Sequence, residues 1–279
     1  MAPPRSRKPG PSDGRRRSTG RQGGSGQTDG QGRSGRPQPP RASAGRRGAS
    51  GGRTPPAKKR RDLTGAAAGL PRWVVESLSR VTPAPRVGAA LDALGQASEA
   101  LSEARYHAAV RYAARAKELA PRDSTVRETL GVAAYRVGDW ATALTELRAF
   151  RRMSGEATHL PIEMDVLRAL GRPADVVTTW KHLAESDATP AVMKEGRVVY
   201  ASFLLDSSRP DEAYAMVRPR RLKSDPLPED LRVWYVAARA AAATNRGDEA
   251  RRLRNAILEA DPAFPGMDEL EVAIARSST

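Results

Sequence analysis

The sequence predicts an all-α protein of repeated helix pairs, preceded by a segment that cannot form a hydrophobic core. Residues 125–152 indicate helix, because they form two amphipathic patterns at helical spacing with a Gly-Asp break between them. The same arrangement of aromatic and small residues occurs 34 residues earlier, which is typical of an internal repeat. Residues 1–62 contain no Leu, Ile, Val, Phe, Tyr or Trp, so the folded region is expected to begin near Leu63.

The repeat is clearest in the second helix of each pair. Trp140 and Ala143 follow the break at Gly138-Asp139, and Tyr106 and Ala109 occupy the same places one repeat earlier. Small residues at such positions allow two helices to approach closely. The period therefore predicts a series of helix-turn-helix units.

These positions resemble the tetratricopeptide repeat family, whose unit has a small residue in its first helix and an aromatic residue followed by Ala in its second. The matching residues are Gly131, Trp140 and Ala143 in one unit, and Ala97, Tyr106, Ala109 and the closing Pro121 in the unit before it. Proline suits the end of a unit because it cannot continue a helix. The resemblance implies a right-handed α-solenoid of stacked helix pairs.

Three later units are weaker copies, each identified by a turn signal followed by Ala or Val. The turn signals lie at residues 171–176, 208–213 and 245–250. Successive copies of the alanine position are 34, 33, 37 and 37 residues apart, so longer loops are expected between the later units. The predicted repeats span about residues 90–123, 124–156, 157–191, 194–230 and 231–264.

Short helices are predicted at both ends of the repeats, at residues 70–82 and 266–276. The first has Trp73, Val74, Leu78 and Val81 on one face, and the last contains the apolar residues Leu270, Val272, Ile274 and Ala275. A solenoid needs such terminal elements because an end repeat otherwise exposes an apolar face.

Two local patterns within the repeats carry separate predictions. Thr125 and Glu128 have the spacing of a capping box, which predicts the start of a helix. Residues 198–205, VVYASFLL, are rich in β-branched and aromatic residues and fit either a buried strand or a helix. Helix is favoured, because the run continues the period of the helix pairs and precedes a Pro-Asp-Glu helix start.

Residues 1–62 are a basic tail with 13 Gly and 9 Pro, predicted to be disordered because it cannot bury apolar surface. It carries 17 Lys and Arg against three Asp, a net charge of +14; the whole chain is +15, which leaves +1 for residues 63–279. Such tails bind polyanions by counterion release, attract anionic lipid headgroups or keep a protein in solution. The candidate polyanion-binding residues are Arg15, Arg16, Arg17, Lys58, Lys59, Arg60 and Arg61.

The sequence offers no motif for catalysis and predicts a non-enzymatic protein without a metal site or cofactor. His107, His159 and His182 belong to different repeats, and none has a partner at convincing ligand spacing. The glycines outside the tail are isolated and match neither a phosphate-binding loop nor a dinucleotide fingerprint.

Location and origin are predicted from composition. The N-terminus has no apolar signal segment, no apolar run is long enough to span a membrane, and Cys is absent, which together predict a cytoplasmic protein. Arg outnumbers Lys by 40 to 7, a bias typical of GC-rich bacterial genomes.

The resemblance also implies a concave surface lined by the first helix of each pair. Carried onto this chain, the lining residues are Glu128, Tyr135, Arg136, Asp165, Arg168, Glu195, Ser202, Arg232, Tyr235 and Arg239. Some family members hold a peptide's terminal carboxylate with Lys and Asn at these places. No first helix here contains Asn, so such a clamp is not predicted.

The predicted function is that of a non-catalytic adaptor or scaffold. It binds a protein or peptide on the concave surface, while the tail attracts an anionic partner. The alternative is an RNA- or ribosome-associated protein that binds mainly through the tail. Helical repeat folds host unrelated functions, so the identity of the partner does not follow from the fold.

Overall fold

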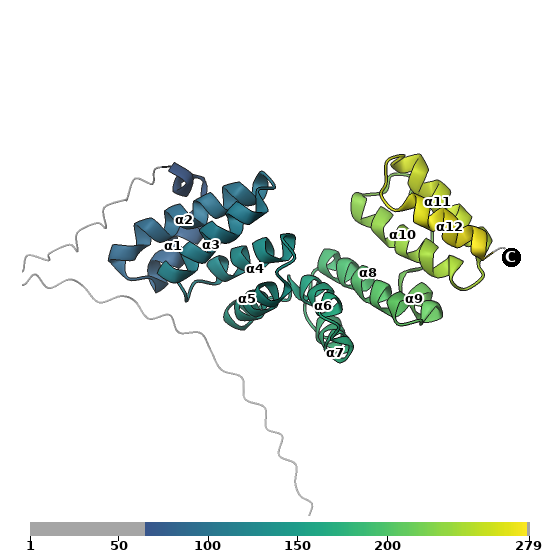
Figure 1. The fold of residues 1–279 in the computed structure, drawn as a ribbon, viewed down its shortest axis with the longest axis horizontal. Coiled ribbons are helices and arrows are strands. Elements are labelled where there is room, and N and C mark those ends of the chain that lie inside the picture. Colours follow the sequence, from purple (N-terminus) through teal and green to yellow (C-terminus); the bar gives the residue numbers. More distant parts are fainter. Residues whose placement is uncertain (1–64, 278–279) are drawn as a thin grey trace, which may run out of the picture. The chain divides into compact units, whose positions relative to one another are not determined.

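The structure is a computed structural model that describes residues 65–277, and its regular secondary structure in this range is entirely helical (Figure 1). The all-α prediction is therefore confirmed for these residues. The basic tail, residues 1–62, lies outside the described residues, together with its candidate polyanion-binding side chains.

The helices pack against their neighbours in sequence. In chain order they are η1 (Gly65–Gly69), α1 (Arg72–Val81), α2 (Ala84–Ser102), α3 (Tyr106–Leu119), α4 (Ser124–Arg136), α5 (Trp140–Ser154), α6 (Leu160–Ala169), α7 (Pro173–Ala184), α8 (Pro190–Asp206), α9 (Pro210–Val217), α10 (Pro228–Ala242), α11 (Gly247–Ala260) and α12 (Met267–Arg276). Five pairs form, α2 with α3, α4 with α5, α6 with α7, α8 with α9 and α10 with α11. First helices of neighbouring pairs also meet, α2 with α4, α6 with α8 and α8 with α10.

Residues 198–205 lie inside α8, so the helical interpretation of this run is confirmed and the strand alternative is wrong. Burial rather than β propensity explains its composition, because Tyr200, Phe203 and Leu204 all pack into the core. Among residues 65–277, no helix has both the length and the apolar character needed to cross a membrane.

The predicted break at Gly138-Asp139 is confirmed, and each residue has a defined part in it. Gly138 has a φ of 78°, a left-handed conformation that glycine adopts without the steric cost of a Cβ atom. Asp139 caps α5, because its Oδ1 accepts a hydrogen bond from the backbone N–H of Thr142 at 3.1 Å. The next residue, Trp140, can therefore begin α5.

The predicted capping box at Thr125 and Glu128 is wrong. Asp123 is the N-cap of α4, and its Oδ1 accepts a hydrogen bond from the backbone N–H of Val126 at 3.0 Å. The helix has already begun at Ser124, so Thr125 lies within its first turn. Asp123 is almost fully buried, and this burial raises the pKa of its carboxyl group, against the opposing hydrogen bond from Val126.

Helix α1 buries a narrower face than the sequence predicts. Val74 and Leu78 are buried, whereas Trp73 is 62% exposed and Val81 is 43% exposed. Residues four apart lie on the same side of a helix, but Trp73 is rotated by about 100° from Val74. Packing against α2 covers only the stripe that contains Val74 and Leu78.

Helix α12 shows the same pattern at the other end of the described residues. Leu270 and Ile274 are buried, and Val272 is 52% exposed. Val272 is apolar but does not face the core, because α10 and α11 contact α12 and cover a single stripe of its side chains.

Three of the predicted repeat starts fall inside helices. Residues 90, 194 and 231 lie within α2, α8 and α10, each of which begins several residues earlier. Pro190 and Pro228 are the first residues of α8 and α10, where the missing N–H costs no intrahelical hydrogen bond. Proline at a first helical position is the sequence signal that marks these two helix starts.

Small residues occupy a close helix contact of the core, as predicted. A Cβ atom added to Gly131 of α4 would lie 2.8 Å from Cδ2 of Leu147 in α5. Ala134 and Ala143, from the same two helices, are fully buried. Only a very small residue at position 131 permits this approach of α4 and α5.

Candidate functional site

The residues predicted to line a binding surface lie on the first helices of four successive pairs. We call this set the first-helix row: Glu128, Tyr135 and Arg136 on α4; Asp165 and Arg168 on α6; Glu195 and Ser202 on α8; and Arg232, Tyr235 and Arg239 on α10. Nearly all of its members are half-buried, and only Arg136 and Arg232 are exposed. Two pairs of them contact one another across neighbouring helices, Tyr135 with Asp165 and Glu195 with Arg232.

A chain of hydrogen bonds joins α4, α6 and α8 through the middle of the row. The hydroxyl of Tyr135 donates to Oδ2 of Asp165 at 2.8 Å, and Arg168 donates to Oδ1 of the same carboxylate at 2.5 Å. Arg168 also donates to Asp206 at 2.6 Å. These hydrogen bonds therefore orient each of the four side chains against a residue on another helix or on the next turn of the same helix.

The environment of Tyr135 keeps its hydroxyl protonated. Burial raises the pKa of Tyr135 to about 12, and the negative charge of Asp165 and the hydrogen bond to it act in the same direction. Glu195 of α8 contributes further negative charge. The phenol is consequently a hydrogen-bond donor at neutral pH and is unsuited to act as a base.

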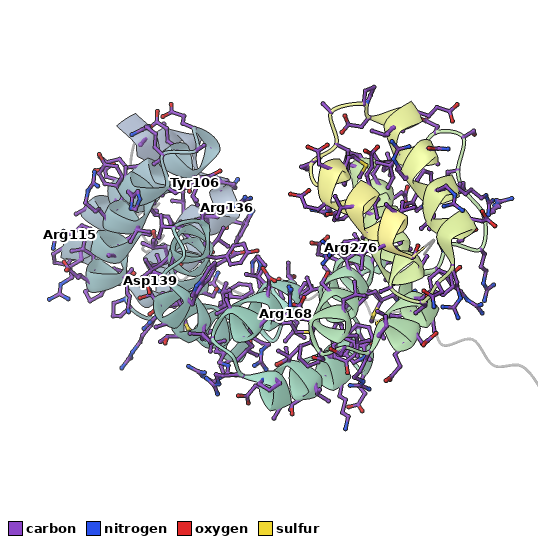
Figure 2. All side chains as sticks on the ribbon, turned by 45° about the vertical axis from the view of Figure 1, so that its right-hand side comes forward. Tyr106, Arg115, Arg136, Asp139, Arg168 and Arg276 are labelled. Carbon is purple, nitrogen blue, oxygen red and sulfur yellow. The ribbon has the colours of Figure 1, made fainter. Side chains whose placement is uncertain are left out.

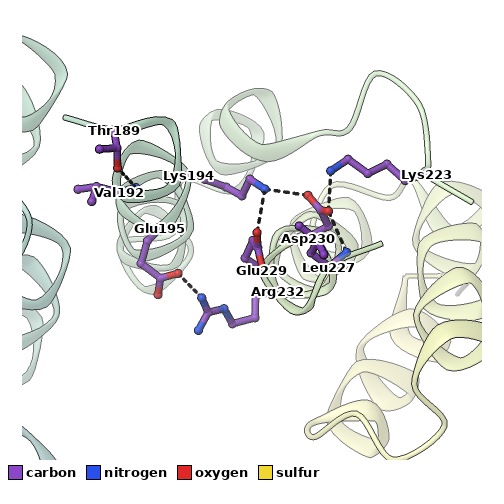
Figure 3. Close-up of polar contacts among 9 residues, drawn as sticks. All are labelled: Thr189, Val192, Lys194, Glu195, Lys223, Leu227, Glu229, Asp230 and Arg232. Atoms are coloured by element: carbon purple, nitrogen blue, oxygen red, sulfur yellow. Dashed lines mark hydrogen bonds and ion pairs between the residues drawn. The ribbon is translucent and has the colours of Figure 1, made fainter. Parts of the chain in front are cut away.

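Two further contacts extend the row in both directions. Nε2 of His159, at the start of α6, lies 2.7 Å from Oε1 of Glu128 on α4. Arg232 of α10 donates to Glu195 of α8 at 2.5 Å (Figure 3). Hydrogen bonds or ion pairs thus connect α4 to α6, α6 to α8 and α8 to α10.

The remaining cations of the row lie over aromatic rings. The guanidinium of Arg136 is 5.6 Å from the ring centre of Tyr106, and both residues are labelled in Figure 2. The guanidinium of Arg239 is 5.8 Å from the ring centre of Tyr235. Neither arginine forms an ion pair with another residue of the described part, so both are available to an external carboxylate.

The other two members of the row, Ser202 and Tyr235, donate hydrogen bonds to backbone carbonyl oxygens. Ser202 donates to the carbonyl oxygen of Val198, one turn earlier, at 2.9 Å. Tyr235 donates to the carbonyl oxygen of Gly266 at 3.3 Å and packs against Phe264. Tyr235 therefore also stabilises the segment before α12, a contact that the sequence did not indicate.

The sequence also did not predict a set of buried carboxylates, each bound by cations from other elements. Glu146 of α5 is 1% exposed and is bound by Lys117 of α3 at 2.6 Å and by Arg127 of α4 at 2.7 Å. Glu163 of α6 is also 1% exposed and is bound by Arg151 of α5 at 3.0 Å. Because water is excluded, these carboxylates depend on their partners and fix the contacts between helix pairs.

Asp230, near the start of α10, is the third such carboxylate (Figure 3). Lys194 of α8 binds one of its oxygens at 2.9 Å, while Lys223 binds the other at 2.6 Å. Burial alone would raise the pKa of Asp230, but the hydrogen bonds from Lys223, Lys194 and the backbone of Leu227 outweigh it and lower the pKa to about 2. The carboxylate is therefore ionised throughout the physiological range.

The polar groups of the first-helix row can present fixed donors and acceptors to a ligand. Within the described range, no group of three or more His, Asp and Glu side chains is arranged to hold a metal ion. His182 lies 3.4 Å from Arg151 and His159 is bound to Glu128, so each of these histidines has a protein partner.

Comparison of the sequence with protein-family models gave no match, and comparison with curated protein sequences gave none either.

Proposed function

We propose that this protein is a non-catalytic adaptor of the tetratricopeptide repeat type, a right-handed solenoid whose first-helix row forms a concave face that binds a protein or peptide. In this proposal the protein is bacterial and cytoplasmic, and the basic tail adds attraction to an anionic partner. The observation that carries the proposal is the mutual fixing of the row's polar side chains, above all the chain from Tyr135 through Asp165 and Arg168 to Asp206.

Fixed polar groups favour binding because little conformational freedom is lost when a partner arrives. Arg168 retains 24% of its side-chain surface and Asp165 retains 32%, so both are oriented by the protein and still reach solvent. Arg136 and Arg239 add cations without a carboxylate partner in the described part. A segment with acidic side chains spaced along α4 to α10 would complement this surface.

The test must separate binding from folding. Reversing the charge of Asp165 or Arg168 would break contacts between helices, so it would not distinguish the two. Arg136→Glu and Arg239→Glu in the full chain alter the row and disturb only a contact with an aromatic ring. Arg122→Glu and Arg152→Glu make the same change in charge at exposed positions outside the row.

The measurement is recovery of a protein partner by each purified variant in about 0.3 M salt, where attraction between exposed charges is strongly screened. We expect the row variant to lose the partner while the control variant and a chain without residues 1–62 keep it. Equal thermal unfolding temperatures of the two variants are required for this comparison. Loss of the partner from both variants would argue against a site on the row.

A second candidate is an RNA- or ribosome-associated protein, which the net charge of +14 on residues 1–62 favours. Binding through the tail should weaken steeply with salt, because the release of condensed counterions supplies most of its free energy. It should also disappear on nuclease treatment and on deletion of the tail. If the chain without its tail holds no protein partner and the tail alone still recovers RNA, this candidate replaces the adaptor.

A further inference from the structure

An open pocket of about 760 Å³ is lined by residues of α8, α9 and the segment that follows α9, together with Glu249 of α11. Its volume is within the range of about 300–1,000 Å³ that is usual for small-molecule sites. Tyr214 and Met216 of α9 supply an aromatic ring and an apolar side chain to its lining. The sequence does not predict this pocket, although the segment after α9 is rich in basic residues.

Three arginines line this pocket: Arg197 of α8, and Arg218 and Arg220 on either side of Pro219. We call them the pocket arginines. None of them forms a hydrogen bond or an ion pair with another residue of the described part, and all three are exposed to solvent. Arginines of the neighbouring part of the chain do pair with carboxylates: Arg209 with Glu212, Arg232 with Glu195, and Arg246 with Asp211.

The one acidic residue of the pocket does not neutralise this charge. Glu249 lies 3.3 Å from Arg252 of its own helix, so its carboxylate already has a cation beside it. Gathering like charges is unfavourable, because they repel one another even in a solvent-exposed site. Residues 63–279 together carry a net charge of only +1, so the cluster is not a consequence of an excess of positive charge there.

The pocket is separate from the first-helix row. Arg197 follows Glu195 by two residues, which places it about 200° around the axis of α8. Glu195 belongs to the row and is bound by Arg232 of α10. A ligand in the pocket therefore leaves the row free, and the two sites can be tested independently.

We propose that this pocket binds a small molecule that carries phosphate groups, which the three pocket arginines hold. Guanidinium groups bind phosphate oxygens through charge-assisted hydrogen bonds. Phosphate is tetrahedral and accepts hydrogen bonds from several directions, which suits cations that come from α8 and from both sides of Pro219. A carboxylate is planar and fits such an arrangement less well. The ring of Tyr214 and the side chain of Met216 provide contacts for the organic part of the ligand.

The test uses pyrophosphate as the probe and the full chain at about 0.15 M salt, with binding followed by titration calorimetry. The pocket variant is Arg197→Gln, Arg218→Gln and Arg220→Gln together. The control variant is Arg86→Gln, Arg122→Gln and Arg152→Gln, three exposed arginines elsewhere that also lack a partner in the described part. Both variants lose three positive charges and keep the basic tail, so any binding by the tail is common to them.

We expect one saturable site per chain, with affinity at least about tenfold weaker in the pocket variant and unchanged in the control, because charge-assisted hydrogen bonds are lost only in the first. Pyrophosphate should also slow backbone hydrogen exchange in residues 214–221 of the unmodified chain, a measurement that needs no variant. Equal weakening in both variants, or the absence of a saturable site, would overturn the proposal. Citrate that competes as well as pyrophosphate would overturn the preference for phosphate.

Discussion

Ion pairs occur both at the buried carboxylates and in the first-helix row, but their effects on stability differ. Glu146 keeps 2% of its side-chain surface and is bound by two cations from other helices. Glu195 of the row keeps 35% and is bound by Arg232 alone. Where water is excluded, an ionised group cannot lose its partner without a large cost, so the pair constrains the fold. Where water remains, the pair contributes little to stability, so it can orient polar groups at the surface without constraining the fold.

The largest expected effect comes from isolating a buried carboxylate. Lys117→Met and Arg127→Met together leave Glu146 without its cations, which should lower the free energy of unfolding by about 3–5 kcal/mol. The measurement is denaturant-induced unfolding of the double variant. Arg232→Met is the matched change in the row and should cost less than about 1 kcal/mol, because Glu195 remains solvated. Similar costs at the two places would remove the distinction between them.

The close contact of α4 and α5 gives the next largest effect. Gly131→Leu should lower the free energy of unfolding by about 1–3 kcal/mol, because its side chain would overlap Leu147. Gly88→Ala in α2 is the control, since a Cβ atom there meets no atom within 4 Å. Alanine is the better helix former, so this change should stabilise by up to about 1 kcal/mol. Opposite shifts of the denaturation midpoint are therefore expected.

Asp230 should make the free energy of unfolding depend on pH. Folding lowers its pKa from 3.8 to about 2, so its contribution is present above about pH 4 and is lost as the pH falls through the folded-state pKa. The contribution at neutral pH is about 2 kcal/mol. Asp230→Asn should therefore be destabilising at pH 7 and much less so near pH 2, as measured by denaturant unfolding at both pH values.

Asp225→Asn is the matched control for Asp230, because Asp225 is exposed and lies in the connector just before α10. Its difference from the unmodified chain should be small and independent of pH. A difference for Asp230→Asn that stayed constant from pH 7 to pH 2 would show that Lys194 and Lys223 do not stabilise the ionised carboxylate.

Periodicity predicts the contacts that repeat, and so the helical character and the close approach at Gly131 could be read from the sequence. The buried carboxylates could not, because a glutamate on an amphipathic helix is usually solvated. Glu146 does carry a signal: it lies three residues after Ala143 and four before Phe150, both of which are buried. A charge at such a core-facing position requires a partner, but the sequence does not show that Lys117 and Arg127 supply it.

The residues of the row could be predicted from the sequence, but those of the pocket could not. The row residues could be placed because they recur on successive first helices, whereas the contact from Tyr135 to Asp165 depends on how two pairs pack. The pocket arginines come from α8 and from an irregular connector, and no period relates these parts of the chain. Trp73 shows the opposite error, since its helical spacing predicts burial, whereas it is 62% exposed in the described part of the chain.

The smallest expected effect on stability is that of deleting residues 1–62, and it tests whether the helices fold independently of the tail. These residues contain no Leu, Ile, Val, Phe, Tyr or Trp, so they have little apolar surface to bury against the helices. The thermal unfolding temperature of the shortened chain should therefore stay within about one degree of that of the full chain, as measured by calorimetry. The deletion removes a net charge of +14 and should at the same time abolish salt-sensitive binding to nucleic acid. A decrease of many degrees would mean that the tail docks on the helices, and the pocket arginines and the first-helix row would then have to be tested for competition with it.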